Sequence, residues 1–154
     1  MLRITRETDY GILLMTYMAE HQGQAYSANL LAEQQKLPVP MVSKILKLLS
    51  KKGLLVSQRG ARGGYCLALT PDEITVADII GALEGPIAIT ECNHEDQGCA
   101  HQPRCTLTGH WHRINSAIHT ALNNISLQDL RQPVSTHPIR MMANPLQFPP
   151  VESI

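Results

Sequence analysis

Hydrophobic residues near the start of the chain recur with the period of an α-helix. Their spacing of i, i+3, i+4, i+7 and i+8 places them on one face of an amphipathic helix. Gly23 marks the end of this helix, and Ser27 suits the N-terminal cap of a short second helix that carries Leu30 and Leu31. The apolar face of the first helix consists of Tyr10, Leu13, Leu14, Tyr17 and Met18.

A third helix and a β-hairpin follow. The helix is predicted between Pro40, which suits a first helical turn, and Gly53, which suits a C-terminal cap. A strand over residues 54–57, a glycine-rich turn over residues 59–64 and a return strand over residues 65–69 come next. This order is that of a winged helix-turn-helix, so we expect a mainly α fold with a two-stranded wing. The buried stripe of the third helix is Val42, Ile45, Leu46 and Leu49.

The second half of the chain contains two further helical patterns. Thr75 and Asp78 form a capping-box pair that opens a helix, and Gly85 with Pro86 ends it. The last long pattern has apolar spacings of 4, 3, 4, 4 and 3, the period of a straight helix. Its narrow stripe packs either on its own domain or on the same helix of a second subunit, and a two-fold DNA binder favours the homodimer. The stripe is Leu107, Trp111, Ile114, Ile118, Leu122 and Ile125.

These patterns divide the chain into four parts. Residues 1–85 are the expected DNA-binding domain, residues 86–106 a cysteine-rich loop, and residues 107–131 a dimerisation helix with a terminal turn. Residues 132–154 hold five prolines and little periodicity, so we expect a disordered tail. No apolar run has the length of a transmembrane helix and the N-terminus has no signal-peptide pattern, so we expect a cytoplasmic protein without a membrane partner.

The net charge of zero hides a strong asymmetry along the chain. Residues 36–62 contain seven basic and no acidic side chains, whereas residues 71–106 contain one basic and seven acidic ones. A solvated helix face is one interpretation of the basic segment, and a surface for double-stranded DNA is the other. In the second interpretation the third helix enters the major groove and the wing reaches a minor groove. The candidate contacts are Met41, Ser43 and Lys44 for bases, Lys47 and Lys51 for phosphates, and Arg59 and Arg62 on the wing.

Cys92, Cys99 and Cys105 share one 14-residue loop with the spacing C-x6-C-x5-C. Thiolates suit iron–sulfur clusters, zinc and Cu(I), and the lack of a tight cysteine pair favours a cluster over zinc or a thiol switch. At least one further ligand has to come from elsewhere. On chemistry alone the candidates are Glu7, Asp9, His94, His101, His110 and His112. Cys66 lies in the middle of a wing strand, where we expect a small buried residue.

The chain contains no nucleotide-binding loop and no nucleophile–base motif. We therefore predict that it is not an enzyme and has no small-molecule substrate. A cluster-bearing redox protein, with the basic segment docking an acidic partner, is the alternative of a different class.

Several longer motifs occur in order along residues 1–131. They are T-D-Y-G at 8–11, V-S-K-I-L-K-L-L-S-K-K-G-L at 42–54, R-G-A-R-G-G-Y at 59–65, I-I-G-A-L-E-G-P at 79–86, T-E-C at 90–92, C-x5-C at 99–105 and W-H-R-I-N-S-A-I at 111–118. Together they resemble the dimeric winged-helix regulators typified by IscR and NsrR, which carry iron–sulfur clusters. The T-E-C and W-x-R-I-N motifs are most similar to the branch that regulates the SUF iron–sulfur assembly operon.

The resemblance implies that the three loop cysteines hold a cluster, with [2Fe–2S] favoured over [4Fe–4S]. IscR-like members use a histidine three residues after the last cysteine, a position that Thr108 occupies here. NsrR-like members use an aspartate within T-D, which matches Asp9, so we prefer Asp9 as the fourth ligand and keep His110 as the runner-up. The implied function is a repressor of an iron–sulfur assembly operon whose operator affinity depends on the cluster.

Overall fold

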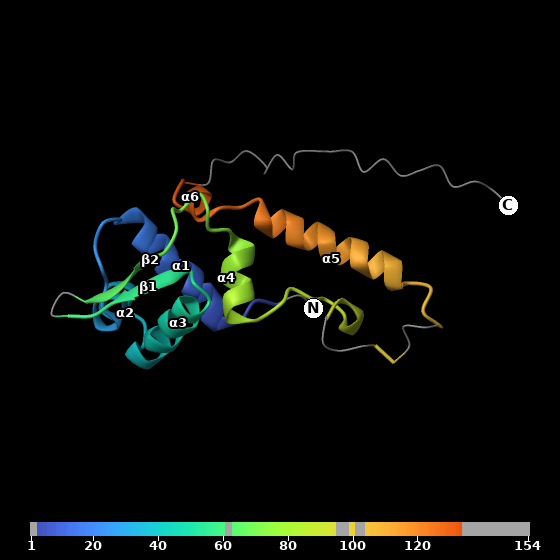
Figure 1. The fold of residues 1–154 in the computed structure, drawn as a ribbon, viewed down its shortest axis with the longest axis horizontal. Helices are drawn as coiled ribbons and strands as arrows, with labels where there is room; N and C mark the ends of the chain where they lie inside the picture. The colour runs from blue at the N-terminus through green and yellow to red at the C-terminus, as the bar shows by residue number, and fades with distance from the viewer. Residues whose placement is uncertain (1–2, 61–62, 95–98, 101–103, 134–154) are drawn as a thin grey trace.

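The computed structural model describes residues 3–60, 63–94, 99–100 and 104–133 (Figure 1). It confirms a mainly α winged helix-turn-helix with a two-stranded wing and a long C-terminal helix. The predicted tail from residue 134 onwards lies outside the described residues. In chain order the elements are α1 (Arg6–Glu20), α2 (Ala28–Gln35), α3 (Val39–Lys51), β1 (Leu55–Gln58), β2 (Gly64–Leu67), α4 (Val76–Leu83), the 3₁₀ turn η1 (Glu91–Asn93), α5 (Thr108–Asn123) and α6 (Leu127–Leu130).

Helix α1 packs against α3, α4, α6 and the wing. Leu14 and Met18 are buried as predicted, but Leu13 is 43% exposed, so the predicted apolar face is wrong at that position. The face is rotated toward Thr8, Gly11 and Met15, because α3 and α4 approach on that side. The periodicity therefore identifies the helix, whereas its tertiary partners decide which of its residues are buried.

The helix-turn-helix unit has the predicted local signals. The Ser27 hydroxyl accepts a hydrogen bond from the Leu30 amide at 3.1 Å and begins α2. Lys36 ends α2 in the left-handed region with φ 53°, and Pro40 lies in the first turn of α3. Gly53 follows α3 with φ 81°, a conformation that favours glycine.

The wing is an antiparallel hairpin in which Leu55 pairs with Leu67 and Gln58 with Gly64. Its strands lie within one or two residues of the predicted bounds. Reciprocal backbone hydrogen bonds of 2.8 Å between Tyr26 and Tyr65 join it to the segment before α2.

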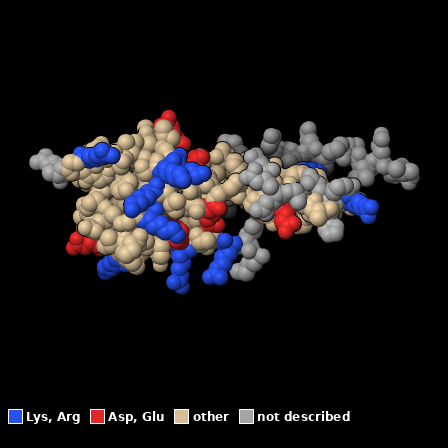
Figure 2. Space-filling view, turned by 60° about the horizontal axis from the view of Figure 1, so that its bottom comes forward, with Lys and Arg blue, Asp and Glu red and all other residues tan. Residues whose placement is uncertain are grey.

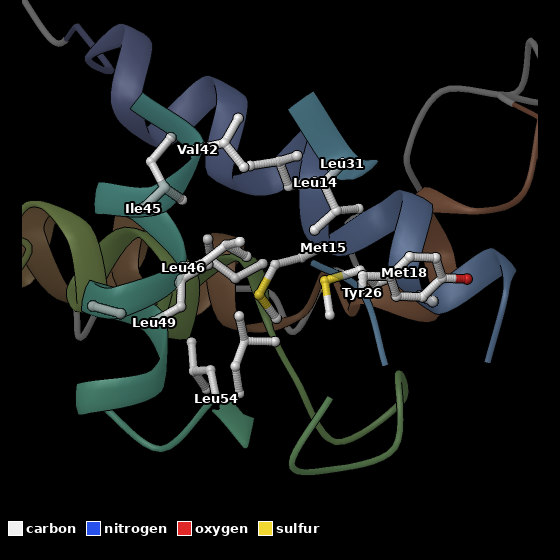
Figure 3. Close-up of a cluster of buried hydrophobic side chains, with 14 of the residues drawn as sticks. Leu14, Met15, Met18, Tyr26, Leu31, Val42, Ile45, Leu46, Leu49 and Leu54 are labelled. Carbon is white, nitrogen blue, oxygen red and sulfur yellow. The ribbon is translucent and has the colours of Figure 1, made fainter. Parts of the chain in front are cut away.

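The core lies between α1, α2 and α3 and continues under α4 (Figure 3). Leu127 of α6 belongs to it and is fully buried. The Leu127 amide donates to the Ile74 carbonyl at 2.7 Å, and the Val76 amide donates to the Ile125 carbonyl at 2.9 Å. The end of the chain's described part therefore returns to the winged-helix domain, a contact that the sequence pattern does not predict. The largest fully buried side chains are Tyr26, Leu14, Met15, Met18, Leu31, Ile45, Leu46, Leu49, Ile74, Ile79, Leu127 and Val42.

Helix α5 extends away from the rest of the chain (Figure 1) and contains no buried residue. Ile114 is 44% exposed, while Trp111, Ile118 and Leu122 are half-buried. The helix ends at Asn123, so the prediction that its stripe continues through Ile125 is wrong. Ile125 lies in the connection to α6, because its backbone pairs with the start of α4.

We expect Gly64→Ala to destabilise the domain by about 2 kcal/mol, since a Cβ at Gly64 would lie 2.5 Å from backbone atoms of Tyr26 that cannot move independently. Gly81→Ala is the matched control, because a Cβ there has open space and helix propensity favours alanine by about 1 kcal/mol. Urea unfolding followed by circular dichroism measures both. Equal stability of the two variants would contradict the close contact at the wing.

Candidate functional site

The basic side chains predicted to contact DNA lie on and beside α3. Lys44, Lys47 and Lys51 are exposed on this helix, and Arg59 is exposed at the end of β1. Figure 2 shows Lys and Arg side chains gathered on the face turned forward from the bottom of Figure 1. Arg62 lies outside the described residues. The charge asymmetry of the sequence therefore corresponds to a basic surface that includes the second helix of the helix-turn-helix.

The three candidate base contacts differ in exposure. Met41 is half-buried and packs partly against the core, and Ser43 is also half-buried. The side chain of Lys44 is 59% exposed and forms an ion pair with Glu7 of α1 at 2.5 Å. Of the three, Lys44 has the greatest reach into solvent.

The four cysteines are free thiols. Cys92 and Cys99 are half-buried and Cys105 is exposed. Within the described ranges, no three His, Cys, Asp or Glu side chains lie together in a group that could hold a metal ion. Among the residues that the structure describes, the candidate ligands of the single chain are therefore not yet brought together. Cys66 is only half-buried, so the expectation of a buried residue there is wrong, because the two-stranded wing leaves part of its strand uncovered.

The other candidate ligands lie on three elements. Asp9 is exposed in α1, and His110 and His112 are exposed in α5. His94 is half-buried after η1, and His101 lies outside the described residues. Glu7 is engaged by Lys44, which the sequence alone does not indicate.

Asparagine side chains tie the start of the cysteine loop to α5. The Asn115 amide donates to the Ile87 carbonyl at 2.9 Å and its oxygen accepts from the Ile89 amide at 3.0 Å. Asn93, next to Cys92, donates to the Thr90 hydroxyl at 2.7 Å and contacts the His112 ring nitrogen Nδ1 at 2.7 Å. The sequence pattern does not predict these contacts, although Asn115 is part of the W-H-R-I-N motif.

The residue that precedes the loop, Glu84 at the end of α4, is tied to the N-terminus of α1. The Thr5 amide donates to the Glu84 carboxylate at 2.9 Å, just before the loop begins. This backbone hydrogen bond, followed by one from the Thr8 side chain, lowers the pKa of Glu84. Thr8 is fully buried beneath this contact. The start of the loop is therefore linked to α5, and the residue that precedes the loop is linked to the N-terminus of α1.

A model of the Rrf2 family, described as an iron-dependent transcriptional regulator, matches residues 4–133. The chain belongs to the Rrf2 family. Its fold is also that of solved members: it superposes on the structure of CymR (YrzC), the global cysteine regulator of Bacillus subtilis, with a TM-score of 0.67, 35% identity, and coverage of 85% of this chain and 97% of that one.

Two relatives match this chain in sequence over most of its length. The protein rrf2 of Nitratidesulfovibrio vulgaris is 31% identical over 89% of this chain and 92% of its own length. The regulator IscR of Aliivibrio salmonicida is 33% identical over 84% of this chain and 77% of its own length. As a member of the Rrf2 family, this chain is a DNA-binding transcription regulator and not an enzyme. In the part of the chain that the structure describes, no helix combines the length and apolar composition needed to span a bilayer.

Thr108 of this Rrf2-family chain has a chemical role beside Cys105. A hydrogen bond from the Thr108 side chain, followed by one from the Leu107 amide, lowers the pKa of the Cys105 thiol. Both donors stabilise the thiolate, the form that binds metals. Where the family resemblance expects a histidine ligand, this chain thus has a side chain that supports the neighbouring thiolate.

We expect alkylation of Cys105 by iodoacetamide in the metal-free protein to reach half its maximal rate below the pH of an ordinary cysteine. The lowered pKa leaves more thiolate at a given pH, so the rate profile shifts to lower pH. Thr108→Val removes the first donor and should move the profile back upward. Peptide mass spectrometry of the labelled protein gives the rate at Cys105, and identical profiles for the two proteins would contradict the role of Thr108.

Proposed function

We propose that this chain is a cytoplasmic homodimeric repressor whose affinity for operator DNA depends on an iron–sulfur cluster held by the cysteine loop. The observation that carries the proposal is the placement of this loop. It contains three free thiols and is hydrogen-bonded to α5, the exposed long helix. It also follows Glu84 at the end of α4, whose carboxylate accepts from the Thr5 amide at the start of α1, the helix that packs on α3. The family's description as iron-dependent regulators supports it.

The donor set fits a cluster in its chemistry, because three thiolates in one segment are the soft ligands that iron–sulfur centres prefer. Cys92, Cys99 and Cys105 would hold the cluster, with Asp9 as the preferred fourth ligand and His110 as the alternative. An exposed Asp9 outside the loop's own chain segment is compatible with a ligand donated across a dimer. When bound, the cluster would supply sensitivity to iron supply and oxidants, with [2Fe–2S] favoured over [4Fe–4S].

DNA binding is assigned to α3 and the wing. We propose that Lys44 reaches base edges from α3, together with Met41 and Ser43, and that Lys47 and Lys51 contact phosphates. Arg59 and Arg62 on the wing would extend the contact into a minor groove.

Helix α5 is the proposed dimer interface. Its apolar stripe contains no buried residue in the single chain and is only partly covered, and a stripe of this kind is stabilised by burial against a second copy. A dimer also presents two recognition helices to two half-sites. The proposed interface residues are Trp111, Ile114, Ile118 and Leu122 of α5, with Ile125 in the connection that follows it.

The chain's own residues then connect the loop to DNA affinity. Asn115 and Asn93 orient the start of the loop on α5, while Thr5 and Glu84 hold its preceding segment on α1. A change in the loop therefore acts on its contacts with α5, while the segment before the loop stays attached to α1. Because half-site spacing is a geometric constraint, a small shift of α5 relative to the winged domain changes operator affinity.

The proposed target is an iron–sulfur assembly operon of the SUF type, on the basis of the T-E-C and W-x-R-I-N motifs. A second candidate is a regulator in which the same thiols act through zinc or through oxidation without a cluster. The similarity to a relative described as a global cysteine regulator favours this alternative enough to test it.

We expect anaerobically purified protein to show a visible absorption band that disappears in Cys92→Ala. Cys66→Ala is the matched control, because Cys66 lies in the wing and should leave the band unchanged. Gel shifts on the DNA upstream of the protein's own gene should show a salt-sensitive complex whose affinity changes when the cluster is removed. Colourless wild-type protein would reject the cluster, and zinc found by elemental mass spectrometry would support the second candidate.

We expect Ile114→Glu to convert the dimer to a monomer and to weaken operator binding at least tenfold, since the charge would be buried in the interface. Ser116→Glu adds the same charge at an exposed position off the apolar stripe and should remain dimeric. Sedimentation equilibrium measures the mass. A monomeric wild-type protein would contradict the interface assignment.

A further inference from the structure

The ion pair between Glu7 and Lys44 connects two helices at the basic surface. Glu7 lies in the first turn of α1 and Lys44 lies near the N-terminal half of α3. The Lys44 ammonium nitrogen Nζ is 2.5 Å from the Glu7 carboxylate oxygen Oε1. A carboxylate thus neutralises a lysine on the helix that is placed to enter the DNA groove.

The Glu7 carboxylate is well positioned for this contact. The N-terminus of α1 is fixed by its cap, in which the Thr8 amide donates to the Thr5 hydroxyl at 3.3 Å, and by the Glu84 contact at the Thr5 amide. A negative charge in the first turn of a helix is also favoured by the helix dipole. Glu7 is half-buried, with 31% of its side chain exposed, whereas Lys44 is mostly in solvent.

Pairing Lys44 with Glu7 affects non-specific DNA and operator DNA differently. Non-specific binding depends on the number of phosphates that basic side chains neutralise, so a lysine held by a carboxylate contributes less to it. An exposed ion pair is weak, changing an equilibrium by about fivefold at most. A base-edge acceptor in the correct geometry can therefore replace Glu7 as the partner of Lys44. A phosphate at an arbitrary position forms a weaker contact with Lys44 while the ion pair is intact.

We propose that Glu7 is a specificity-determining residue that restrains Lys44 and so weakens binding to non-specific DNA. The proposal rests on the DNA-binding surface assigned above and is independent of what the cysteine loop holds.

The test measures binding to a 30-base-pair duplex of scrambled sequence by fluorescence anisotropy between 50 and 200 mM KCl. The proteins are wild type, Glu7→Gln, Lys44→Met, the double variant and Glu20→Gln. All are compared at the same cluster content of the cysteine loop, which visible absorbance checks. Glu20→Gln is the matched control. It removes the same charge from the same helix roughly 20 Å away, beyond the screening length, and should change affinity by less than about 1.5-fold.

We expect Glu7→Gln to bind the scrambled duplex about three- to fivefold more tightly, with the slope of log K against log salt steeper by about 0.9. The gain should vanish in the Lys44→Met background. Unchanged or weaker binding by Glu7→Gln overturns the proposal, as does a gain that persists without Lys44, because the carboxylate would then act on DNA directly. A loss of visible absorption in Glu7→Gln also overturns it, since Glu7 would act through the loop.

These failures are distinct from failure of the proposed function. Wild-type protein that binds neither the scrambled duplex nor its own upstream DNA at 50 mM KCl removes the DNA-binding surface on which the inference rests. If operator affinity does not change when the cluster is removed, the proposed cluster-dependent regulation is rejected, but the comparison of the Glu7 variants stays valid.

Discussion

The close approach of α1 to α3 and α4 is the contact on which the rest of the structure depends. A Cβ at Gly11 would lie 2.4 Å from the Leu83 side chain of α4 and 3.5 Å from Ile45 of α3, so the helices meet where α1 has no side chain. Thr8, one turn earlier, is fully buried. These contacts assign different roles to the residues of the T-D-Y-G motif. Its Thr8 and Gly11 pack against neighbouring helices, while its Asp9 remains exposed. The same helix thus supports the recognition helix and presents a candidate ligand.

Helix α1 also links regions that are distant in sequence. Its first turn contacts α3 through Glu7 and the end of α4 through Thr5, and α4 leads directly into the cysteine loop. The Glu84 contact just before the loop and the ion pair at the basic surface therefore both involve residues 5–7 of the chain.

Much of the architecture could be predicted because its signals are local. Ser27, Gly53 and the Thr75–Asp78 pair mark helix ends through hydrogen bonds to neighbouring residues, and the structure contains each of them. The burial of Leu127 and the exposure of Leu13 could not be predicted, since both depend on which distant element packs there. The same holds for the site. Spacing identifies the cysteines, and charge identifies the basic surface. The Glu7–Lys44 pair and the Asn115 contacts arise only when α1 crosses α3 and when residues 87–89 lie beside α5.

The strengths of these contacts determine which part of the molecule can move. The winged domain is stabilised by a core of fully buried aliphatic side chains, and the burial of each contributes about 1.5–3 kcal/mol to the free energy of folding. The start of the cysteine loop is held by side-chain hydrogen bonds from Asn115 and Asn93, which contribute about 1 kcal/mol each. In the proposed function, ligation of a cluster by several thiolates exceeds that energy, so the loop conformation would change on binding while the winged domain would not. The change would then reach the rest of the molecule as a shift of α5, absorbed between Asn123, where α5 ends, and Leu127, which is anchored in the core.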